Sequence, residues 1–341
     1  MKILIATKYP SHRKYMNDML AAAIRNLAPN IEVECTYTNL KSYKAVLPKL
    51  RKTHYDYLFV WNGSEAADIG PLRTAKGLTN VIYFEVGWFP GRPICTMYAD
   101  PSGINADASI RKTSIIGFGD HTEEVAEIRK RLTEKYAPMY PDSTCHTRDL
   151  GTGFIFVPLQ LPTNTNIVRH SNFKSMREFI PFCKRMFPHS KVVFKKHPED
   201  DRTYGSDVLS SGNINDLLWR CKAVVGINST VLVEALIHNR PVASVGKGLL
   251  TGLGVHLECH ENYARLPHLI HSNWQPDKAV VDEVIYELYT NRQLSLEFPG
   301  ALERSLKRNR VLSPILMSGG MKVEEPSIAD CGDAEDNSSA V

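Results

Sequence analysis

The sequence has few cysteines and no long hydrophobic run. Seven cysteines are scattered over 341 residues, without a C-x-x-C pair or metal-finger spacing. An odd number of isolated cysteines argues against a disulfide framework or a zinc site and fits a reducing cytoplasm. No apolar run reaches the roughly 18 residues of a membrane span, and the first apolar stretch, Ile3–Ala6, is too short for a signal peptide. We therefore expect a soluble cytoplasmic protein.

Charge is also modest, since 41 basic and 37 acidic residues give a net charge of +4. Residues 319–341 hold six acids and one lysine, so their net charge of −5 leaves +9 for the rest of the chain. That excess favours anionic ligands, and it would allow peripheral contact with the inner membrane face. No basic patch with interleaved aromatic residues is present, so nucleic-acid binding is not expected. The acidic tail, 319–341, has too few apolar residues to order and is predicted to be disordered.

Strand-like runs alternate with amphipathic helices in two series. The first has strands near 3–6, 32–36, 57–61 and 81–85, with helices near 16–27, 43–51 and 66–75. The second has strands near 154–158, 191–194, 223–227 and 241–245, with helices near 175–187, 215–220 and 231–238. Such alternation predicts βαβ units around parallel sheets. We therefore predict an α/β, GT-B-like fold, in which two facing Rossmann-like domains enclose a central cleft.

The domain boundary is expected near residue 150. In this prediction, residues 1–150 form the first domain, which includes long loops at 86–122 and a helix at 123–136. Residues 137–152 are the linker. Residues 151–318 form the second domain. Helices near 278–290 and 300–309 close the fold and would cross back toward the first domain. The 43% apolar content suffices for two moderate cores.

Two buried strands run directly into polar residues, and this pattern is the most informative in the sequence. The residues after these strands are Lys196, His197, Pro198, Asn228, Ser229 and Thr230. The carboxyl ends of parallel strands face a crevice, and a helix beginning there presents N–H groups to a phosphate. The arrangement therefore predicts a site for a nucleotide-activated donor.

Four segments in order resemble the bacterial capsule polysaccharide biosynthesis family, whose studied members include retaining β-Kdo transferases that use CMP-Kdo. The segments are Phe84–Pro90, Asp100–Ser109, Val157–Ile167, and the pair formed by 196–198 and 228–234. Together they lie within about residues 80 to 250. The resemblance implies that the second domain binds the donor and that the first supplies acceptor contacts and reactive carboxylates.

By this resemblance, Lys196 and His197 contact the CMP moiety, and Ser229 and Thr230 lie near its phosphate. Glu234 follows Thr230 by one helical turn, so its carboxylate could accept both ribose hydroxyls. The alternative is structural: Ser229 would only cap its helix, and Glu234 would be a solvated helix residue. Gln160 is expected at the inner rim of the second domain. Asn164 stands where related sequences often carry an acid, and a hydrogen-bonded turn is as reasonable for it as substrate contact.

Transfer from CMP passes through an oxocarbenium-like state, which a carboxylate can stabilise or capture while a second carboxyl group handles the acceptor proton. The resemblance implies double displacement through Asp100, the aspartate of the D-x-x-G segment. Glu85 is the candidate acid/base and Asp107 a third choice. The alternative for Asp100 is that it starts an ordinary Asp-Pro-Ser-Gly turn.

The sequence thus predicts a retaining glycosyltransferase that transfers Kdo or a related 2-keto sugar acid from CMP to a glycan or glycolipid. No metal and no cofactor besides the CMP-Kdo donor are expected, since no D-x-D pair ends a strand. Two alternatives remain open. One is a sugar-nucleotide or glycan-binding protein without turnover, which Asn164 favours, and the other is a GT-B-like sugar-nucleotide epimerase.

Overall fold

A computed structural model describes residues 1–37, 42–89, 96–112, 120–134, 150–161, 164–296 and 300–322. Most of the predicted linker at 137–152 and of the predicted disordered tail at 319–341 lies outside these residues. Within the described ranges, no helix has the length and apolar character needed to span a bilayer.

The first sheet has six strands in the order β12-β5-β4-β3-β1-β2. Its parallel strands are β1 (Lys2–Thr7), β2 (Glu32–Tyr37), β3 (Tyr57–Trp61) and β4 (Asn80–Val86). Antiparallel strands β5 (Thr96–Asp100) and β12 (Gln293–Ser295) extend the β4 edge. The helices of this part are α1 (Pro10–Arg13), a π-helical segment Lys14–Leu20, α2 (Ala21–Leu27), α3 (Leu47–Lys52) and α4 (Ala66–Lys76).

The second sheet also has six strands, all parallel, in the order β11-β10-β9-β6-β7-β8. They are β6 (Ile155–Pro158), β7 (Val192–Lys195), β8 (Val208–Leu209), β9 (Ala223–Gly226), β10 (Val242–Ser244) and β11 (Leu257–Glu258). Its helices are α6 (Thr165–His170), α7 (Met176–Met186), α8 (Ile214–Arg220), α9 (Val231–Ile237) and α10 (His268–His271).

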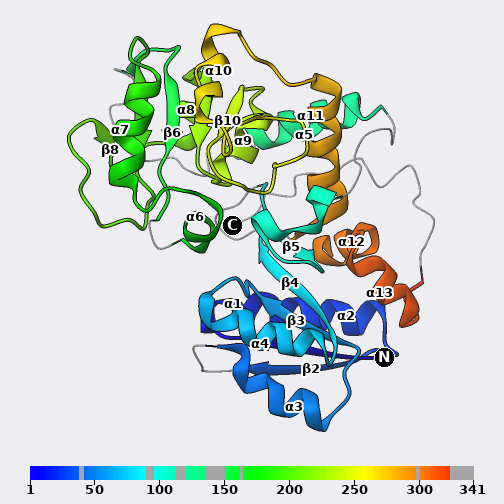
Figure 1. The fold of residues 1–341 in the computed structure, drawn as a ribbon. Coiled ribbons are helices and arrows are strands. Elements are labelled where there is room, and N and C mark those ends of the chain that lie inside the picture. The colour runs from blue at the N-terminus through cyan, green and yellow to red at the C-terminus, as the bar shows by residue number, and fades with distance from the viewer. Residues whose placement is uncertain are drawn as a thin grey trace, which may run out of the picture.

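The central strands of both sheets are buried on both faces, which explains their nearly continuous apolar sequences. Along β1, Ile3 and Ile5 join the core under α2, whereas Leu4 and Ala6 face the core that includes α3 and α4. This alternation follows from the two-residue side-chain period of a strand. Each Rossmann-like sheet therefore packs against helices on both faces. In Figure 1 the second domain lies above the first.

A boundary near residue 150 places the helix at 122–134 in the first domain, whereas it packs in the second. The helix near 300–309 crosses back to the first domain as expected, but the helix near 278–290 stays with the second. Helix α5 (Thr122–Glu134) packs on α9 and on α11 (Lys278–Tyr286) of the second domain. Strand β12, α12 (Ala301–Arg308) and α13 (Leu312–Ser318) return to the first domain, where Leu306 and Leu316 join the core with Ile3. Figure 1 shows α12 and α13 beside the first domain and α5 beside α11. The domain to which each of these helices belongs is set by the core that buries its apolar face, and not by its position in the sequence.

The prediction of long loops over 86–122 was wrong in part. Strand β5 lies there, fully buried, and pairs with β4 and β12. Short 3₁₀ turns follow at Asn105–Asp107 and Ser109–Lys112. The five-residue strand escapes periodicity because Gly- and Pro-rich segments flank it, and its partner β12 is almost 200 residues away in the sequence.

Candidate functional site

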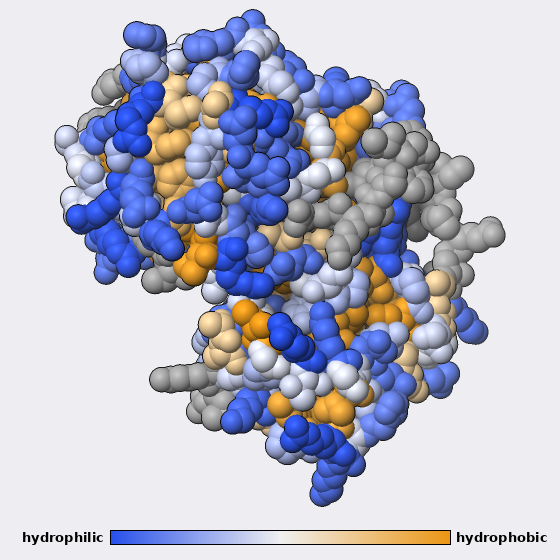
Figure 2. All heavy atoms as spheres, in the orientation of Figure 1, coloured by the Kyte–Doolittle hydropathy of each residue, from blue (hydrophilic) through white to orange (hydrophobic). Residues whose placement is uncertain are grey.

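A cavity of about 400 Å³ lies between the two domains, and we call it the central cavity. Its first-domain wall comprises Asn62, residues 85–87 and residues 104–105. Its second-domain wall comprises residues 158–160, 164–166, 195–198, 228–231 and Glu234, together with Gly212 and residues 214–215. Figure 2 shows the constriction between the two lobes from one side, with hydrophilic residues over much of this face.

Strand ends build this cavity. Asn62, Glu85, Pro158, Lys195 and Asn228 lie at or just after the carboxyl ends of β3, β4, β6, β7 and β9, in that order. Strands that run in parallel all end at the same edge of a sheet, so the polar residues that follow them are collected at one place.

The structure brings nine of the predicted site residues to this one cavity. They are Glu85, Gln160, Lys196, His197, Pro198, Asn228, Ser229, Thr230 and Glu234. Asp100 and Asp107 are absent from its lining.

Glu85 is the carboxylate that the first domain presents to the cavity. Its Oε2 accepts a hydrogen bond from Asn62 Nδ2 at 2.8 Å, and its Oε1 accepts one from the Val86 amide at 3.0 Å. Asn62 has a φ of 62°, a left-handed conformation that asparagine tolerates better than most residues. The turn after β3 therefore fixes the orientation of Glu85.

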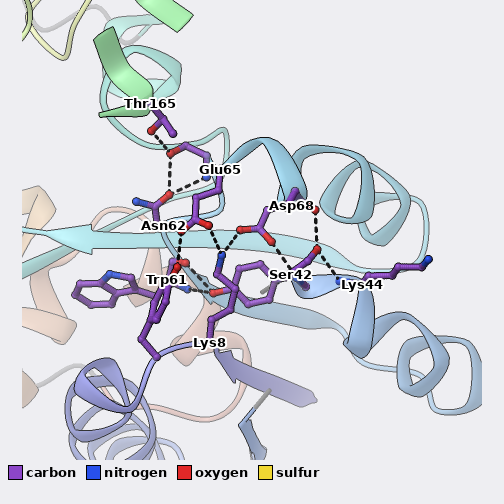
Figure 3. Close-up of polar contacts among 12 residues, drawn as sticks. Lys8, Ser42, Lys44, Trp61, Asn62, Glu65, Asp68 and Thr165 are labelled. Carbon is purple, nitrogen blue, oxygen red and sulfur yellow. Dashed lines mark hydrogen bonds and ion pairs between the residues drawn. The ribbon is translucent and has the colours of Figure 1, made fainter. Parts of the chain in front are cut away.

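The same turn contacts the second domain. Asn62 Oδ1 accepts hydrogen bonds from the Ser64 amide at 2.8 Å and from Ser64 Oγ at 2.7 Å. Ser64 Oγ in turn lies 2.9 Å from Oγ1 of Thr165, the first residue of α6 (Figure 3). A chain of hydrogen bonds thus connects Glu85 to the opposite domain.

A buried ion pair anchors the start of α4 beneath this turn. Lys8 Nζ lies 2.5 Å from Asp68 Oδ2 and 3.0 Å from Glu65 Oε2 (Figure 3). Burial alone would lower the pKa of Lys8, but hydrogen bonds to Asp68 and Glu65 outweigh it and raise that pKa. The lysine therefore stays charged, and its ion pairs connect the end of β1 to the start of α4.

Basic residues at the end of β7 line the second-domain wall. Lys195 is buried, and Lys196 and His197 follow it into the cavity. His197 Nδ1 accepts a hydrogen bond from the Glu199 amide at 3.2 Å, so the neutral ring carries its proton on Nε2. The wall thus offers positive charge and an N–H donor, which suit a phosphate or a pyrimidine carbonyl.

Asn228 connects three loops of the second domain. Its Nδ2 donates to the carbonyls of Asn166 and Lys247 at 3.0 and 2.9 Å. Gln160 Nε2 donates to Asn228 Oδ1 at 3.0 Å, and the Asn228 amide donates to Gln160 Oε1 at 3.2 Å. Asn164 caps α6, because its Oδ1 accepts from the Asn166 amide at 2.9 Å, while it also lines the cavity. Both readings of Asn164 thus fit its position.

Ser229, Thr230 and Glu234 lie at the start of α9. Ser229 Oγ accepts a hydrogen bond from the Val231 amide at 3.2 Å, as in the capping alternative, yet Ser229 also lines the cavity. Burial raises the pKa of Glu234 to about 7. Glu234 is therefore not an ordinary solvated helix residue, and its charge changes near neutral pH.

Asp100 is turned away from the cavity. It is 3% exposed, and its Oδ1 accepts from the amides of Ser102 and Gly103 at 2.8 and 3.3 Å. Its Oδ2 accepts from the amide and hydroxyl of Ser109 at 2.7 and 2.8 Å. The carboxylate thus starts the turn described as its alternative role. The hypothesis that Asp100 attacks the anomeric carbon has no support from this geometry, because both oxygens are bound within their own loop.

Asp107 lies at a contact between the domains. Its Oδ2 is 3.2 Å from Arg169 Nη1 and 3.5 Å from His170 Nε2, both on α6. Asp107 therefore faces a neighbouring cavity instead of the central one, and ion pairing explains its position.

Sequence reasoning missed Asn62, Ser64 and Asn105, whereas Thr165 lies in the stretch 164–166 expected at the inner rim of the second domain. Lys196 was identified because polar residues directly after a buried strand lie at the carboxyl edge of the sheet. The same argument applies to Asn62, which directly follows β3. The contact of Ser64 with Thr165 had no signal, since it joins two domains. Among the residues that the structure describes, no group of three or more His, Cys, Asp or Glu could hold a metal ion.

The family model described as capsule polysaccharide biosynthesis protein matches residues 121–298. Protein FixF of Sinorhizobium fredii is 29% identical over 242 residues, covering 64% of this chain and 57% of FixF. The capsule polysaccharide export protein KpsS of Escherichia coli is 28% identical over 151 residues, covering 38% of this chain and 36% of KpsS. The chain thus spans about half or less of the length of these relatives.

Two solved structures of Thermosulfurimonas dismutans KpsC share the fold. Its beta Kdo 2,7 transferase matches with a TM-score of 0.56 and 18% identity, over 93% of this chain and 97% of that one. Its beta Kdo 2,4 transferase matches with a TM-score of 0.52 and 14% identity, over 82% of this chain and 88% of that one. Together with the two sheets described above, these matches confirm the predicted GT-B-like pair of Rossmann-like domains.

Proposed function

The chain belongs to the capsule polysaccharide biosynthesis protein family, and on this premise we propose that it is a glycosyltransferase. It transfers Kdo or a related 2-keto sugar acid from a CMP-activated donor to a glycan or glycolipid. The observation that carries the proposal is the convergence of nine expected residues, from both domains, on one cavity. Its volume of about 400 Å³ falls in the range of small-molecule sites.

The donor occupies the second-domain wall in this proposal. Lys196 and His197 contact the CMP moiety, Ser229 and Thr230 lie beside its phosphate, and Glu234 accepts the two ribose hydroxyls. Cationic side chains match the phosphate charge that grows as CMP leaves, so they favour the transition state over the bound donor. This role needs no metal ion.

Glu85 is the reactive carboxylate in this proposal, in place of Asp100. The first domain holds Glu85 at the cavity, where the anomeric carbon would lie opposite the CMP-binding wall. In the first step of a double displacement with retention, a Glu85 oxygen bonds to the anomeric carbon while the bond between that carbon and the CMP phosphate oxygen breaks. The acceptor oxygen then attacks the anomeric carbon from the face that CMP left, the bond to Glu85 breaks, and the acceptor's hydroxyl proton passes to a phosphate oxygen of the CMP still bound in the cavity.

The purified chain should release CMP from CMP-Kdo, faster when an acceptor glycolipid is present. Tight CMP-Kdo binding without release would instead support the binding-protein alternative. Neither binding nor release of CMP would contradict the donor assignment. A change at the sugar ring with the CMP bond intact would indicate the epimerase alternative.

Donor affinity should rise with pH through about 7, because only ionised Glu234 accepts two charge-assisted hydrogen bonds from the ribose. With a pKa near 7, about a tenth of the sites are ionised at pH 6 and about nine tenths at pH 8, so the donor Kd should fall about ten-fold between them. Calorimetric titration of CMP at both pH values measures this.

Glu234→Gln should abolish most of this pH dependence and bind like the low-pH form. Exposed Glu127 provides the matched control, since Glu127→Gln should leave the profile unchanged. The folded-state pKa lies above the ordinary value of 4.5, so the stability that protonated Glu234 contributes is lost as pH rises from about 4.5 to about 7. In the ligand-free protein, Glu234→Gln should therefore also reduce the fall in the free energy of unfolding between about pH 4.5 and pH 7. An unchanged donor profile in this variant would remove Glu234 from the ribose site.

We further propose that the protein works on the cytoplasmic side of the membrane, where its excess of basic residues would favour peripheral contact with anionic lipid. Flotation with anionic and neutral vesicles tests the contact, and equal binding to both would contradict it.

A further inference from the structure

Three residues of the central cavity, Gly212, Ile214 and Asn215, are not explained by binding of the phosphate or the ribose. They lie where α8 begins, and Asn215 is the second residue of that helix. The Asn213 side chain caps the helix, since its Oδ1 accepts a hydrogen bond from the Asn215 amide at 2.8 Å. The cap fixes the backbone at Asn215, beside the cavity.

The order of contacts along α9 places these residues near the base of a bound nucleotide. In the proposed donor site, the phosphate lies at Ser229 and Thr230 and the ribose at Glu234. His238 follows Glu234 by four residues, so it lies one turn further along the same face of the helix. Its ring contacts Asn215 at the start of α8. Because phosphate and base leave opposite ends of a ribose, the base would lie toward Asn215.

His238 orients the side chain of Asn215. Its Nε2 lies 3.4 Å from Asn215 Oδ1, whereas its Nδ1 is buried and has no hydrogen-bond partner among the described residues. Burial, with the positive charges of Arg240 and Arg129, lowers the pKa of His238 to about 4, so the ring is neutral and carries one proton. A proton on Nδ1 would be buried without an acceptor. We therefore place it on Nε2, which donates it to Asn215 Oδ1.

This hydrogen bond leaves the other half of the Asn215 amide for a ligand. Within the described ranges, Asn215 Nδ2 has no hydrogen-bond partner. An N–H donor can distinguish two pyrimidines at one atom, because N3 of cytosine accepts a hydrogen bond and N3 of uracil carries a hydrogen. Two donors that face each other are both left unsatisfied, which weakens binding. The amide orientation set by His238 therefore suits cytosine and disfavours uracil.

We propose that Asn215, held by His238, selects the cytosine base of the donor by donating from Nδ2 to N3 of the ring. The proposal rests on the CMP-dependent function proposed above and adds the residue that selects the base. Asn215 contacts the base, and His238 is a positioning residue that acts through Asn215. Ile214 supplies apolar surface for the ring, and Gly212 brings no side chain into the space.

Binding of nucleoside monophosphates, without any sugar donor, tests the base site separately from the reaction. CMP, UMP and 3-deazacytidine 5′-monophosphate, in which a C–H group replaces N3, are titrated calorimetrically against the full chain. We expect CMP to bind about 30-fold more tightly than UMP and about ten-fold more tightly than the 3-deaza analogue, which loses one hydrogen bond. Equal affinity for CMP and the 3-deaza analogue would overturn the proposal.

Asn215→Asp should reverse the preference, because its carboxylate accepts from N3–H of uracil and repels the lone pair on N3 of cytosine. The fold should be retained, since an acid suits the first turn of a helix. Both nucleotides carry the same phosphate, so the ratio of their affinities does not depend on its repulsion by the new charge. The matched control is Asn273→Asp, at an exposed residue of the second domain, which should keep the preference for CMP. An undiminished preference for CMP in Asn215→Asp would refute the assignment.

His238→Phe tests the positioning role. It removes the Nε2 donor and keeps an aromatic ring, so the Asn215 amide can turn and offer either Oδ1 or Nδ2 to the base. The preference for CMP over UMP should fall about ten-fold, because UMP then gains an acceptor for its N3–H. A purely structural role would change both affinities alike. An unchanged ratio would therefore overturn the proposed part of His238.

The outcomes also separate this proposal from the one on which it rests. Selective CMP binding that depends on Asn215, without any CMP-Kdo turnover, would support the base site and contradict the transferase. Turnover of CMP-Kdo with a CMP preference that survives Asn215→Asp would support the transferase and overturn the base site.

Discussion

Replacing Glu85 with glutamine should lower sugar transfer about 1,000-fold or more, which is the usual cost of losing a reactive carboxylate. The amide keeps the size of the side chain, and its oxygen can still accept from Asn62. It can neither bond to the anomeric carbon nor balance positive charge there. The fold and CMP affinity should change little, since Glu85 lies across the cavity from the donor wall. Rates of CMP release and calorimetric titration of CMP measure the two effects.

The control is Glu127→Gln, the same change on the exposed face of α5, which should transfer at the normal rate. Intact-mass measurement after mixing with CMP-Kdo then tests the mechanism. A sugar adduct mapped to Glu85 would support double displacement through it. An adduct on Asp100 would show that the 102–109 loop opens during the reaction and would overturn the role given to Glu85. Full activity of Glu85→Gln would do so as well.

Asp100→Ala should destabilise the fold by about 3 kcal/mol, because it leaves four buried or partly buried donors without their charged acceptor. These donors are the amides of Ser102, Gly103 and Ser109 and the Ser109 hydroxyl. The loop they belong to leads into Ile104 and Asn105 at the central cavity, so activity should fall together with stability. Urea unfolding followed by circular dichroism measures the change.

Asp201→Ala is the matched control, since that aspartate is exposed and the change should stay within about 0.5 kcal/mol. A variant Asp100→Ala that unfolds like the wild type but transfers no sugar would refute the structural role. In that case the prediction from sequence, with Asp100 as nucleophile, would be the better account.

Much of the fold could be read from local pattern. Strands β1, β3 and β4 of the first domain appear as apolar runs of about the right length, because strands buried on both faces must be apolar throughout. The residues at strand ends, such as His197 and Ser229, could be placed at a common edge by the same logic. Strand β5, which pairs with β4 and with β12 from the far end of the chain, was not predicted, because Gly- and Pro-rich segments flank its five residues.

The candidate site divides in the same way. Local sequence indicated that Glu85 ends a strand and that Asp100 begins a turn, but it could not say which carboxylate faces the donor. Only the folded chain shows that loop amides and a hydroxyl surround Asp100, whereas Asn62 holds Glu85 at the cavity. The fate of each carboxylate depends on groups from other segments, and no periodicity encodes those.

The sequence by itself determined the α/β class, the two series of βα units and the polar strand ends of the donor wall. These follow from burial and side-chain period, which act between near neighbours in the chain. The tertiary structure alone decided the packing of α5 in the second domain, the contact of Ser64 with Thr165, and the cavity between α4 and the 102–107 segment. Each of these needs segments far apart in the sequence to meet, and that meeting is set by the packing of the whole chain.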